Sequence, residues 1–240
     1  MKKGKDIDEF TFSYISKLQL PKNNRHYIFG FLFIYLDIMG IIPLISAPFS
    51  IQLFWAGIIP IIAINLWGLV CFIAPYKFEH AFYLFFGVLG LVTTYIYFLV
   101  IQKFLFFNIG VKQNYYFYIG LVAIISLLLF FHIYYRKMLK KRTFQKNQKQ
   151  GIKINVAPIV VMSSFGYIIA QLLMSSFVTD SLQLIVLILI LAIFTVLTSF
   201  LSTWIQKYIF IKQNYDTVKK LRPDFNLSKS ERENYIKNMR

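Results

Sequence analysis

The sequence has few of the groups that carry out enzymatic chemistry. Its 240 residues include one cysteine (Cys71), three histidines (His26, His80 and His132) and ten acidic residues. One cysteine excludes a disulfide framework, and so few ligand side chains disfavour a zinc or haem site. The chain also lacks an HExxH, a GxSxG and a glycine-rich phosphate-loop motif. We therefore expect no catalytic residue, no metal and no cofactor, and a protein that is not an enzyme.

Charged residues of all kinds are scarce, and apolar residues are abundant. Charged residues make up 15% of the chain and hydrophobic residues 58%, with a mean hydropathy of +0.59. In soluble domains, charged residues make up about 25% of the chain and apolar residues about 45–50%. Six apolar runs are long enough to cross a hydrocarbon core of about 30 Å at 1.5 Å per residue. The runs are Ile28–Ile45, Ile51–Ala74, Ala81–Phe107, Tyr115–Tyr135, Val156–Phe177 and Leu182–Trp204. We predict an all-α polytopic membrane protein, a bundle of six transmembrane helices.

The distribution of positive charge predicts the orientation of this bundle. Six crossings put both termini on one side, and every lysine and arginine of the 26 except Lys103 and Lys112 then falls on that side. The positive-inside rule places that side, with the N- and C-termini, in the cytoplasm. We expect a multi-pass protein of a bacterial plasma membrane, in which the net charge of +16 mainly sets topology.

The chain divides into three parts. Residues 1–27 form a cytoplasmic arm in which Tyr14, Ile15 and Leu18 recur at helical spacing, and we predict a short amphipathic helix on the inner membrane surface. Residues 28–210 form the transmembrane domain. Residues 211–240 form a basic cytoplasmic tail, where Ser228 and Glu231 have the spacing of a helix capping box.

A cytoplasmic loop at residues 136–154 carries a run of positive charge without any acidic residue. Such a run attracts anionic lipid headgroups or sets topology. It also suits an acidic cytoplasmic partner, whereas we expect no nucleic acid, because Phe144 is its one interleaved aromatic residue. The residues predicted to contact lipid or a partner are Arg136, Lys137, Lys140, Lys141 and Arg142.

Asp37 is the one acidic residue near the middle of a predicted span. An acidic side chain there costs about 2.5–3.5 kcal/mol, and such groups usually face a bundle interior or a wet cavity on an ion or substrate path. Counting back from the turn near residue 49 puts Asn65 at a similar depth, as a hydrogen-bond partner. Asp37 is then either a protonatable or cation-contacting site, or a neutral group bonded to Asn65 or to backbone freed by Gly40 and Pro43.

Hydroxyl and amide side chains form stripes on the last two predicted spans. Their spacing keeps each set on one face of a helix turning 100° per residue. The stripes either hold neighbouring helices together or line a path for a bound molecule. They comprise Ser164, Tyr167, Gln171 and Ser175 on the fifth span, and Thr195, Thr198, Ser199, Ser202 and Thr203 on the sixth. As candidate binding residues we take all four of the fifth span, with Thr195 and Ser199.

Three functions remain open. A transport or permease-like component, with a cytoplasmic ATPase as a candidate partner, would have a polar cavity reaching Asp37. An immunity, sensor or secretion-accessory protein that binds another membrane protein or a peptide would have a dry bundle and an exposed apolar face. A membrane enzyme would need Glu79, His80 and His132 to converge within hydrogen-bond distance. We expect the first.

Overall fold

The computed structural model describes residues 14–15, 18–140 and 180–238, and every regular element in these ranges is a helix. Five stretches are long and apolar enough to cross a membrane: Pro21–Ile45, Ile51–Ile73, Glu79–Asn108, Tyr115–Leu139 and Leu182–Gln213. They correspond to five of the six predicted spans. The predicted span Val156–Phe177 lies outside the described residues. A helical membrane protein is therefore supported, and the count of six stays a prediction.

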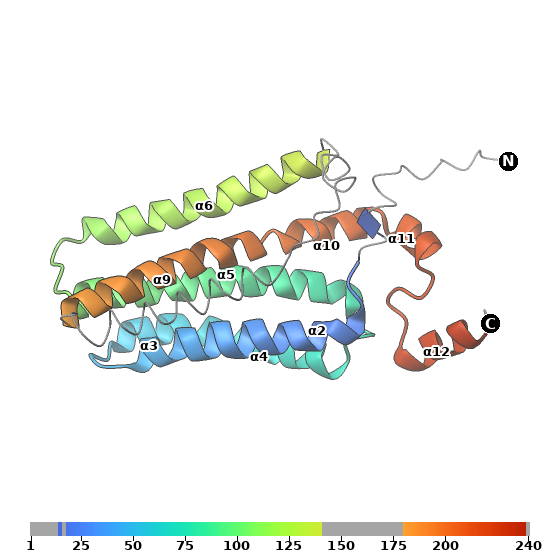
Figure 1. The fold of residues 1–240 in the computed structure, drawn as a ribbon, viewed down its shortest axis with the longest axis horizontal. Coiled ribbons are helices and arrows are strands. Elements are labelled where there is room, and N and C mark those ends of the chain that lie inside the picture. Colours follow the sequence, from blue (N-terminus) through green and yellow to red (C-terminus); the bar gives the residue numbers. More distant parts are fainter. Residues whose placement is uncertain (1–13, 16–17, 141–179, 239–240) are drawn as a thin grey trace, which may run out of the picture.

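The five long stretches run side by side along the length of the molecule (Figure 1). The first is built from α2 (Pro21–Ile28), a π-helical segment (Phe29–Ile41) and α3 (Ile42–Ile45). The others are α4 (Ile51–Ile73), α5 (Glu79–Lys103) with a π-helical end (Phe104–Asn108), α6 (Tyr115–Lys140), and α9 (Asp180–Leu201) continued by α10 (Trp204–Gln213). Two short helices follow, α11 (Tyr215–Leu221) and α12 (Lys229–Asn238).

The first four long stretches alternate in direction along the chain, whereas α6 and α9 run in the same direction (Figure 1). The chain enters α2 and leaves α10 at the same end of the bundle, where α11 and α12 also lie (Figure 1). Lys140, at the end of α6, lies at that end, whereas Asp180, at the start of α9, lies at the opposite end.

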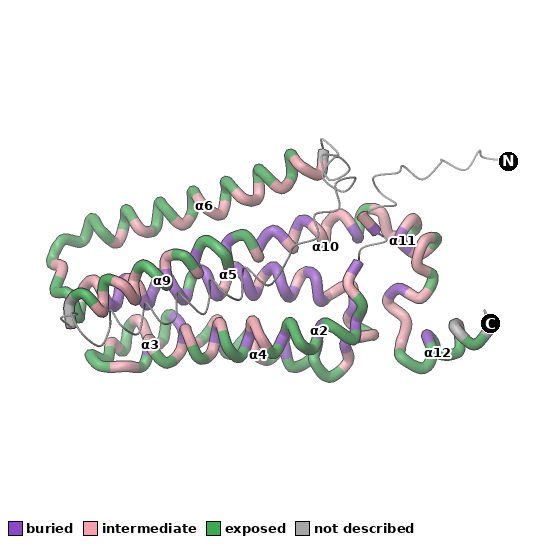
Figure 2. The backbone as a smooth tube through the Cα atoms, in the orientation of Figure 1, coloured by how far each residue is buried: buried purple, intermediate pink, exposed green. Residues whose placement is uncertain are grey.

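The central element is α5, which is buried along most of its length (Figure 2). Two glycines let α9 and α10 approach it closely. A Cβ on Gly90 would lie 2.6 Å from the backbone nitrogen of Ser202, and one on Gly87 would lie 2.6 Å from that of Ile205. Both distances are below van der Waals contact, so any larger residue would push the helices apart.

The N-terminal arm, which the sequence predicts to lie on the membrane surface, packs against the helical bundle and the tail. Ile15 and Leu18 are buried in a cluster with Tyr83, Ile211 and the tail residue Phe225, so these apolar side chains are covered by α5, α10 and the tail instead of lipid. The hydroxyls of Tyr14 and Tyr135 lie 2.9 Å apart, which joins the arm to α6. Burial raises the pKa of Tyr14 above its ordinary value, so the phenol stays neutral.

The first membrane-spanning helix starts earlier than predicted. It begins at Pro21, because proline is favoured in the first turn of a helix, where its missing N–H is not needed. The polar residues that follow Pro21 therefore belong to a helix continuous with the apolar span.

In the tail, Ser228 and Glu231 bond reciprocally: the Ser228 N–H donates to the Glu231 carboxylate at 2.8 Å, and the Glu231 N–H donates to the Ser228 hydroxyl at 3.4 Å. The predicted capping box is confirmed.

Candidate functional site

Asp37 and Asn65 are hydrogen-bonded, as their predicted depths indicate. The Asn65 amide donates to one Asp37 carboxyl oxygen at 2.9 Å and to the Ile61 carbonyl at 3.1 Å. Both side chains are half-buried. The second Asp37 oxygen and the Asn65 side-chain carbonyl have no hydrogen-bond partner among the described residues. The pair therefore presents two acceptors and keeps its own donors occupied.

The pair lies in an apolar groove between the first span and α4. The groove has a volume of about 540 Å³, and Asp37 and Asn65 are the polar residues in its lining. Phe33, Ile62 and Leu66 on its walls are 49%, 52% and 62% exposed, so the groove opens on the outer surface of the described bundle. Among its other lining residues are Leu32, Ile41, Ile58 and Leu69.

Among the described residues, Asp37 faces neither the centre of the bundle nor a polar cavity. Leu36 and Gly40 turn toward α5 and are buried, and a Cβ on Gly40 would lie 2.9 Å from the Ile96 side chain. Leu36 and Gly40 lie on the face of the first span that α5 covers. The neighbouring residue Asp37 therefore points away from α5, into the groove between the first span and α4. The groove around it, as lined by the described residues, is apolar except for Asp37 and Asn65.

A buried lysine stabilises the helix break beyond Asp37. Lys103 of α5 is fully buried and donates to the carbonyls of Pro43 at 2.8 Å, Leu44 at 3.0 Å and Ser46 at 2.5 Å. The last carbonyls of a helix lack intrahelical partners and carry partial negative charge, so a cation suits them. The positive-inside count assigns Lys103 to the outer side and predicts no structural role for it. Its place inside the predicted span 81–107 was the available signal of a buried role.

The hydroxyl stripe of the last span faces α5. The Thr94 hydroxyl lies 2.9 Å from that of Thr198 and 3.3 Å from that of Ser199. Thr195 and Ser199 donate to carbonyls of their own helix and do not line the Asp37 groove. These contacts hold α5 and α9 together. The predicted binding residues of the fifth span, Ser164, Tyr167, Gln171 and Ser175, lie outside the described residues.

Of the five residues predicted to contact lipid or a partner, Arg136, Lys137 and Lys140 lie within the described residues. Arg136 donates to the Gln206 side chain at 3.1 Å, so it connects α6 to α10. Lys137 is exposed, and Lys140 ends α6. Lys141 and Arg142 lie outside the described residues.

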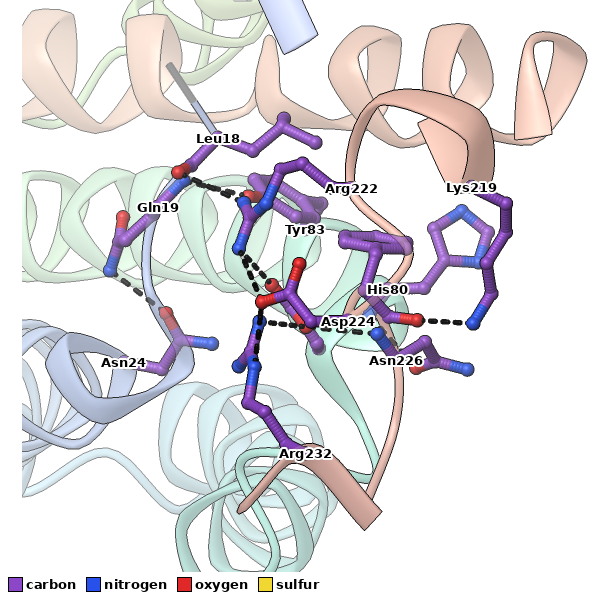
Figure 3. A network of polar contacts seen from close by, with 12 residues as sticks. Leu18, Gln19, Asn24, His80, Tyr83, Lys219, Arg222, Asp224, Asn226 and Arg232 are labelled. Carbon is purple, nitrogen blue, oxygen red and sulfur yellow. Dashed lines mark hydrogen bonds and ion pairs between the residues drawn. The ribbon is translucent and has the colours of Figure 1, made fainter. Parts of the chain in front are cut away.

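Glu79, His80 and His132 do not converge. The buried Glu79 carboxylate accepts a hydrogen bond from the Asn226 N–H at 3.0 Å and lies 3.4 Å from Arg222 and 3.7 Å from Arg232, which joins the tail to α5 (Figure 3). His80 and His132 contact other residues, as described next.

His80 stacks on Tyr208, with 4.4 Å between ring centroids. His132 lies between Ser202, at 3.1 Å, and the Gln206 amide, at 3.0 Å. The described part of the chain contains no group of three His, Cys, Asp or Glu residues that could hold a metal ion. Among the described contacts, Glu79, His80 and His132 form no hydrogen bond with one another.

No protein-family model matches the chain. No curated protein and no solved structure matches it significantly. The groove, the charges near it and the packing of α5 are thus the observations on which a function can be based.

Proposed function

We propose that the protein is a transport or permease-like component of the plasma membrane that takes an amphiphilic substrate from the lipid phase into the Asp37–Asn65 groove. The observation that carries the proposal is the position of a half-buried carboxyl group in an apolar groove that opens sideways. An ionisable group at membrane depth favours a functional site. The exposed apolar walls favour entry from lipid over entry from water.

The groove indicates the chemistry of the substrate. Its apolar walls suit a hydrocarbon chain. The second Asp37 oxygen and the Asn65 carbonyl are acceptors, so they suit a group that donates hydrogen bonds. An amine fits best, because a charge-assisted hydrogen bond to a carboxylate is about twice as strong as a neutral one. We therefore infer an alkyl amine or a similar amphiphile.

The orientation is part of the proposal. Lys22, Arg25, Lys77 and Arg136 lie at the end of the bundle where α2 begins, and Lys103 lies at the other end. We propose that the α2 end faces the cytoplasm, because positive residues are enriched on that side of membrane proteins.

Photolabelling tests the substrate site. Protein in lipid nanodiscs is exposed to an alkyl amine that carries a diazirine in its chain, and the labelled peptides are identified by mass spectrometry. We expect labelling of peptides from the first span and α4. Asp37→Asn should lower the labelling by the amine several-fold, because a neutral amide cannot pair with the ammonium group.

The matched control is an alcohol probe with the same chain and diazirine. Its labelling should be similar in the wild type and in Asp37→Asn, because the apolar walls are unchanged. Equal amine labelling of the two proteins, or labelling confined to other helices, would contradict the proposed site.

A second candidate function is the binding of another membrane protein or peptide without transport. The large aromatic side chains of Phe82, Phe85, Phe86 and Tyr97 are buried along α5, which is the dry packing that this function predicts. Transbilayer movement of a fluorescent alkyl amine in proteoliposomes separates the two. Movement that Asp37→Asn abolishes supports transport, whereas amine binding without movement favours the second candidate.

A further inference from the structure

A second depression lies at the α2 end of the bundle and is lined by positive charge. This basic hollow has a volume of about 530 Å³. Four cationic side chains line it, together with two hydroxyl groups and the turn after α4, and its lining includes no acidic residue. The cationic and hydroxyl residues are Lys22, Arg25, Lys77, Lys229, Tyr76 and Ser228.

Arg25 is held in place at the wall of the hollow. Its guanidinium donates to the Phe72 carbonyl at 3.0 Å and to the Ile73 carbonyl at 3.3 Å, and it lies 5.5 Å from the centre of the Phe72 ring. These carbonyls belong to the last turn of α4, where intrahelical partners are missing. Two of the five guanidinium N–H groups are used, so three remain for a ligand.

The other cations are less engaged. Lys22 and Lys77 are exposed and form no ion pair within the described ranges. Lys229 lies 3.9 Å from Glu233, and both side chains are well exposed. Glu231 is the other nearby acid, and it bonds to Ser228 as the cap of α12. The hollow therefore retains a positive excess after its neighbouring carboxylates are counted.

The hollow adjoins the apolar groove. Phe72 lines the groove, Ile73 lines the hollow, and Arg25 bonds to the carbonyls of both. Along α4 the groove extends from Ile58 to Phe72, about 21 Å at 1.5 Å per residue. That length exceeds half of a hydrocarbon core of about 30 Å. A cationic site at one end of an apolar channel of this length matches a lipid with an anionic headgroup.

We infer that the basic hollow binds a phosphate group, supplied by the headgroup of an anionic phospholipid whose acyl chain follows the groove. Bidentate and charge-assisted hydrogen bonds from a guanidinium suit phosphate oxygens, and lysines add charge. A soluble phosphate compound would offer the same chemistry, but the adjoining groove favours the lipid. The inference shares the apolar groove with the proposed transport role, but its phosphate site is separate, because the lining of the hollow does not include Asp37.

Lipid retention on the purified full-length chain tests the inference. Native mass spectrometry in detergent measures binding of a phosphatidylglycerol and of a diacylglycerol with the same chains. We expect the phosphatidylglycerol to bind more tightly. Each lysine near an anionic group is worth about fivefold in affinity, so Lys22→Gln with Lys77→Gln should weaken its binding roughly 25-fold.

The control variant removes the same charge from two exposed lysines of the tail that do not line the hollow, Lys220→Gln with Lys237→Gln. It should bind phosphatidylglycerol like the wild type. If the hollow variant does not purify folded, the single variants Lys22→Gln and Lys77→Gln replace it, each with about a fivefold loss.

Competition with millimolar pyrophosphate identifies the source of the phosphate. Phosphatidylglycerol that stays bound supports the lipid, and displacement supports a soluble phosphate compound in the same hollow. The inference is overturned if phosphatidylglycerol does not bind, if diacylglycerol binds as tightly, or if the hollow and tail variants weaken binding equally.

Discussion

At the scale of single residues, Lys103 joins two helices through one ammonium group. Its bonds to the carbonyls of Pro43, Leu44 and Ser46 satisfy the end of α3 where the backbone leaves the helix. A backbone group left without a partner in an apolar surrounding costs free energy, so the break needs this or an equivalent donor. Lys103 therefore stabilises the turn that connects the first span to α4.

Lys103→Met tests this role, because methionine has a similar length and no donor. We expect the free energy of unfolding to fall by about 2 kcal/mol or more, since several acceptors lose their donor. The midpoint of thermal unfolding in detergent should fall by roughly 4–8 °C. Lys112→Met, which removes the other outer-side lysine from an exposed position, should change the midpoint little. Equal effects of the two substitutions would contradict the account.

The pairing of Asp37 with Asn65 could be predicted from sequence, but its surroundings could not. Both residues lie at similar distances from the turn that joins their helices, so depth alone brings them together. Which face of the first span meets α5 depends on the packing of Leu36 and Gly40 against Ile96, which is a contact between distant segments. The sequence pattern around Asp37 is apolar on all sides and carries no signal of that choice.

At the scale of elements, the contact between α5 and α9–α10 depends on small residues. Gly90 lies against backbone atoms of Ser202 and Thr198, and the hydroxyl of Thr94 meets those of Thr198 and Ser199. Small residues allow helices in membranes to approach closely, and hydroxyl contacts add about 0.6 kcal/mol each. The stripe was visible in the sequence, but its partner on α5 is a tertiary contact that spacing along one helix does not reveal.

Gly90→Ala should separate these helices. Its Cβ would lie 2.6 Å from the Ser202 nitrogen and 2.8 Å from the Thr198 carbonyl oxygen, which are backbone atoms that cannot rotate away. We expect destabilisation of about 1–3 kcal/mol, measured by unfolding in detergent. Gly30→Ala is the control, because nothing lies within 4 Å of its Cβ. The account is wrong at this contact if both variants unfold alike.

The capping box of α12 predicts a pH dependence. Hydrogen bonds with Ser228 hold the pKa of Glu231 below its ordinary value of 4.5. A depressed pKa in the folded state means that the cap stabilises α12 above the ordinary value and is lost as pH falls through the folded pKa. Hydrogen exchange of α12, corrected for intrinsic rates, should therefore accelerate at acid pH.

Glu231→Gln provides the control for this pH dependence, since glutamine can accept the same hydrogen bonds without titrating. Exchange in α12 of this variant should change less between neutral and acid pH. The same acceleration in both proteins would show that another group causes it.

At the scale of the whole molecule, the apolar runs and their alternation predicted most of the fold. Five predicted spans coincide with long helices, because twenty apolar residues in sequence leave few alternatives to a membrane helix. The packing of the tail against the bundle is not predicted by the sequence. It forms because Glu79 attracts Arg222 and Arg232 and because Phe225 joins a cluster with Ile15, contacts between residues far apart in the chain.

Cysteine labelling tests the proposed orientation. The native Cys71 is buried, so new cysteines at exposed positions can be read separately. We expect a membrane-impermeant maleimide to label Lys112→Cys in intact cells and to label Lys220→Cys only after the membrane is opened. The reverse pattern would place the α2 end outside the cell.

The central claim is that Asp37 is reached sideways from the lipid phase, and carbodiimide modification of protein in lipid bilayers tests it most directly. Carbodiimides add to protonated carboxyl groups, and the modified peptide is found by mass spectrometry. We predict that dicyclohexylcarbodiimide, which partitions into lipid, modifies Asp37, while a water-soluble carbodiimide does not. Modification by the water-soluble reagent would show access from water, and an Asp37 that reacts with neither reagent at acid pH, where its carboxyl group is protonated, would show a closed site; either result would contradict the account.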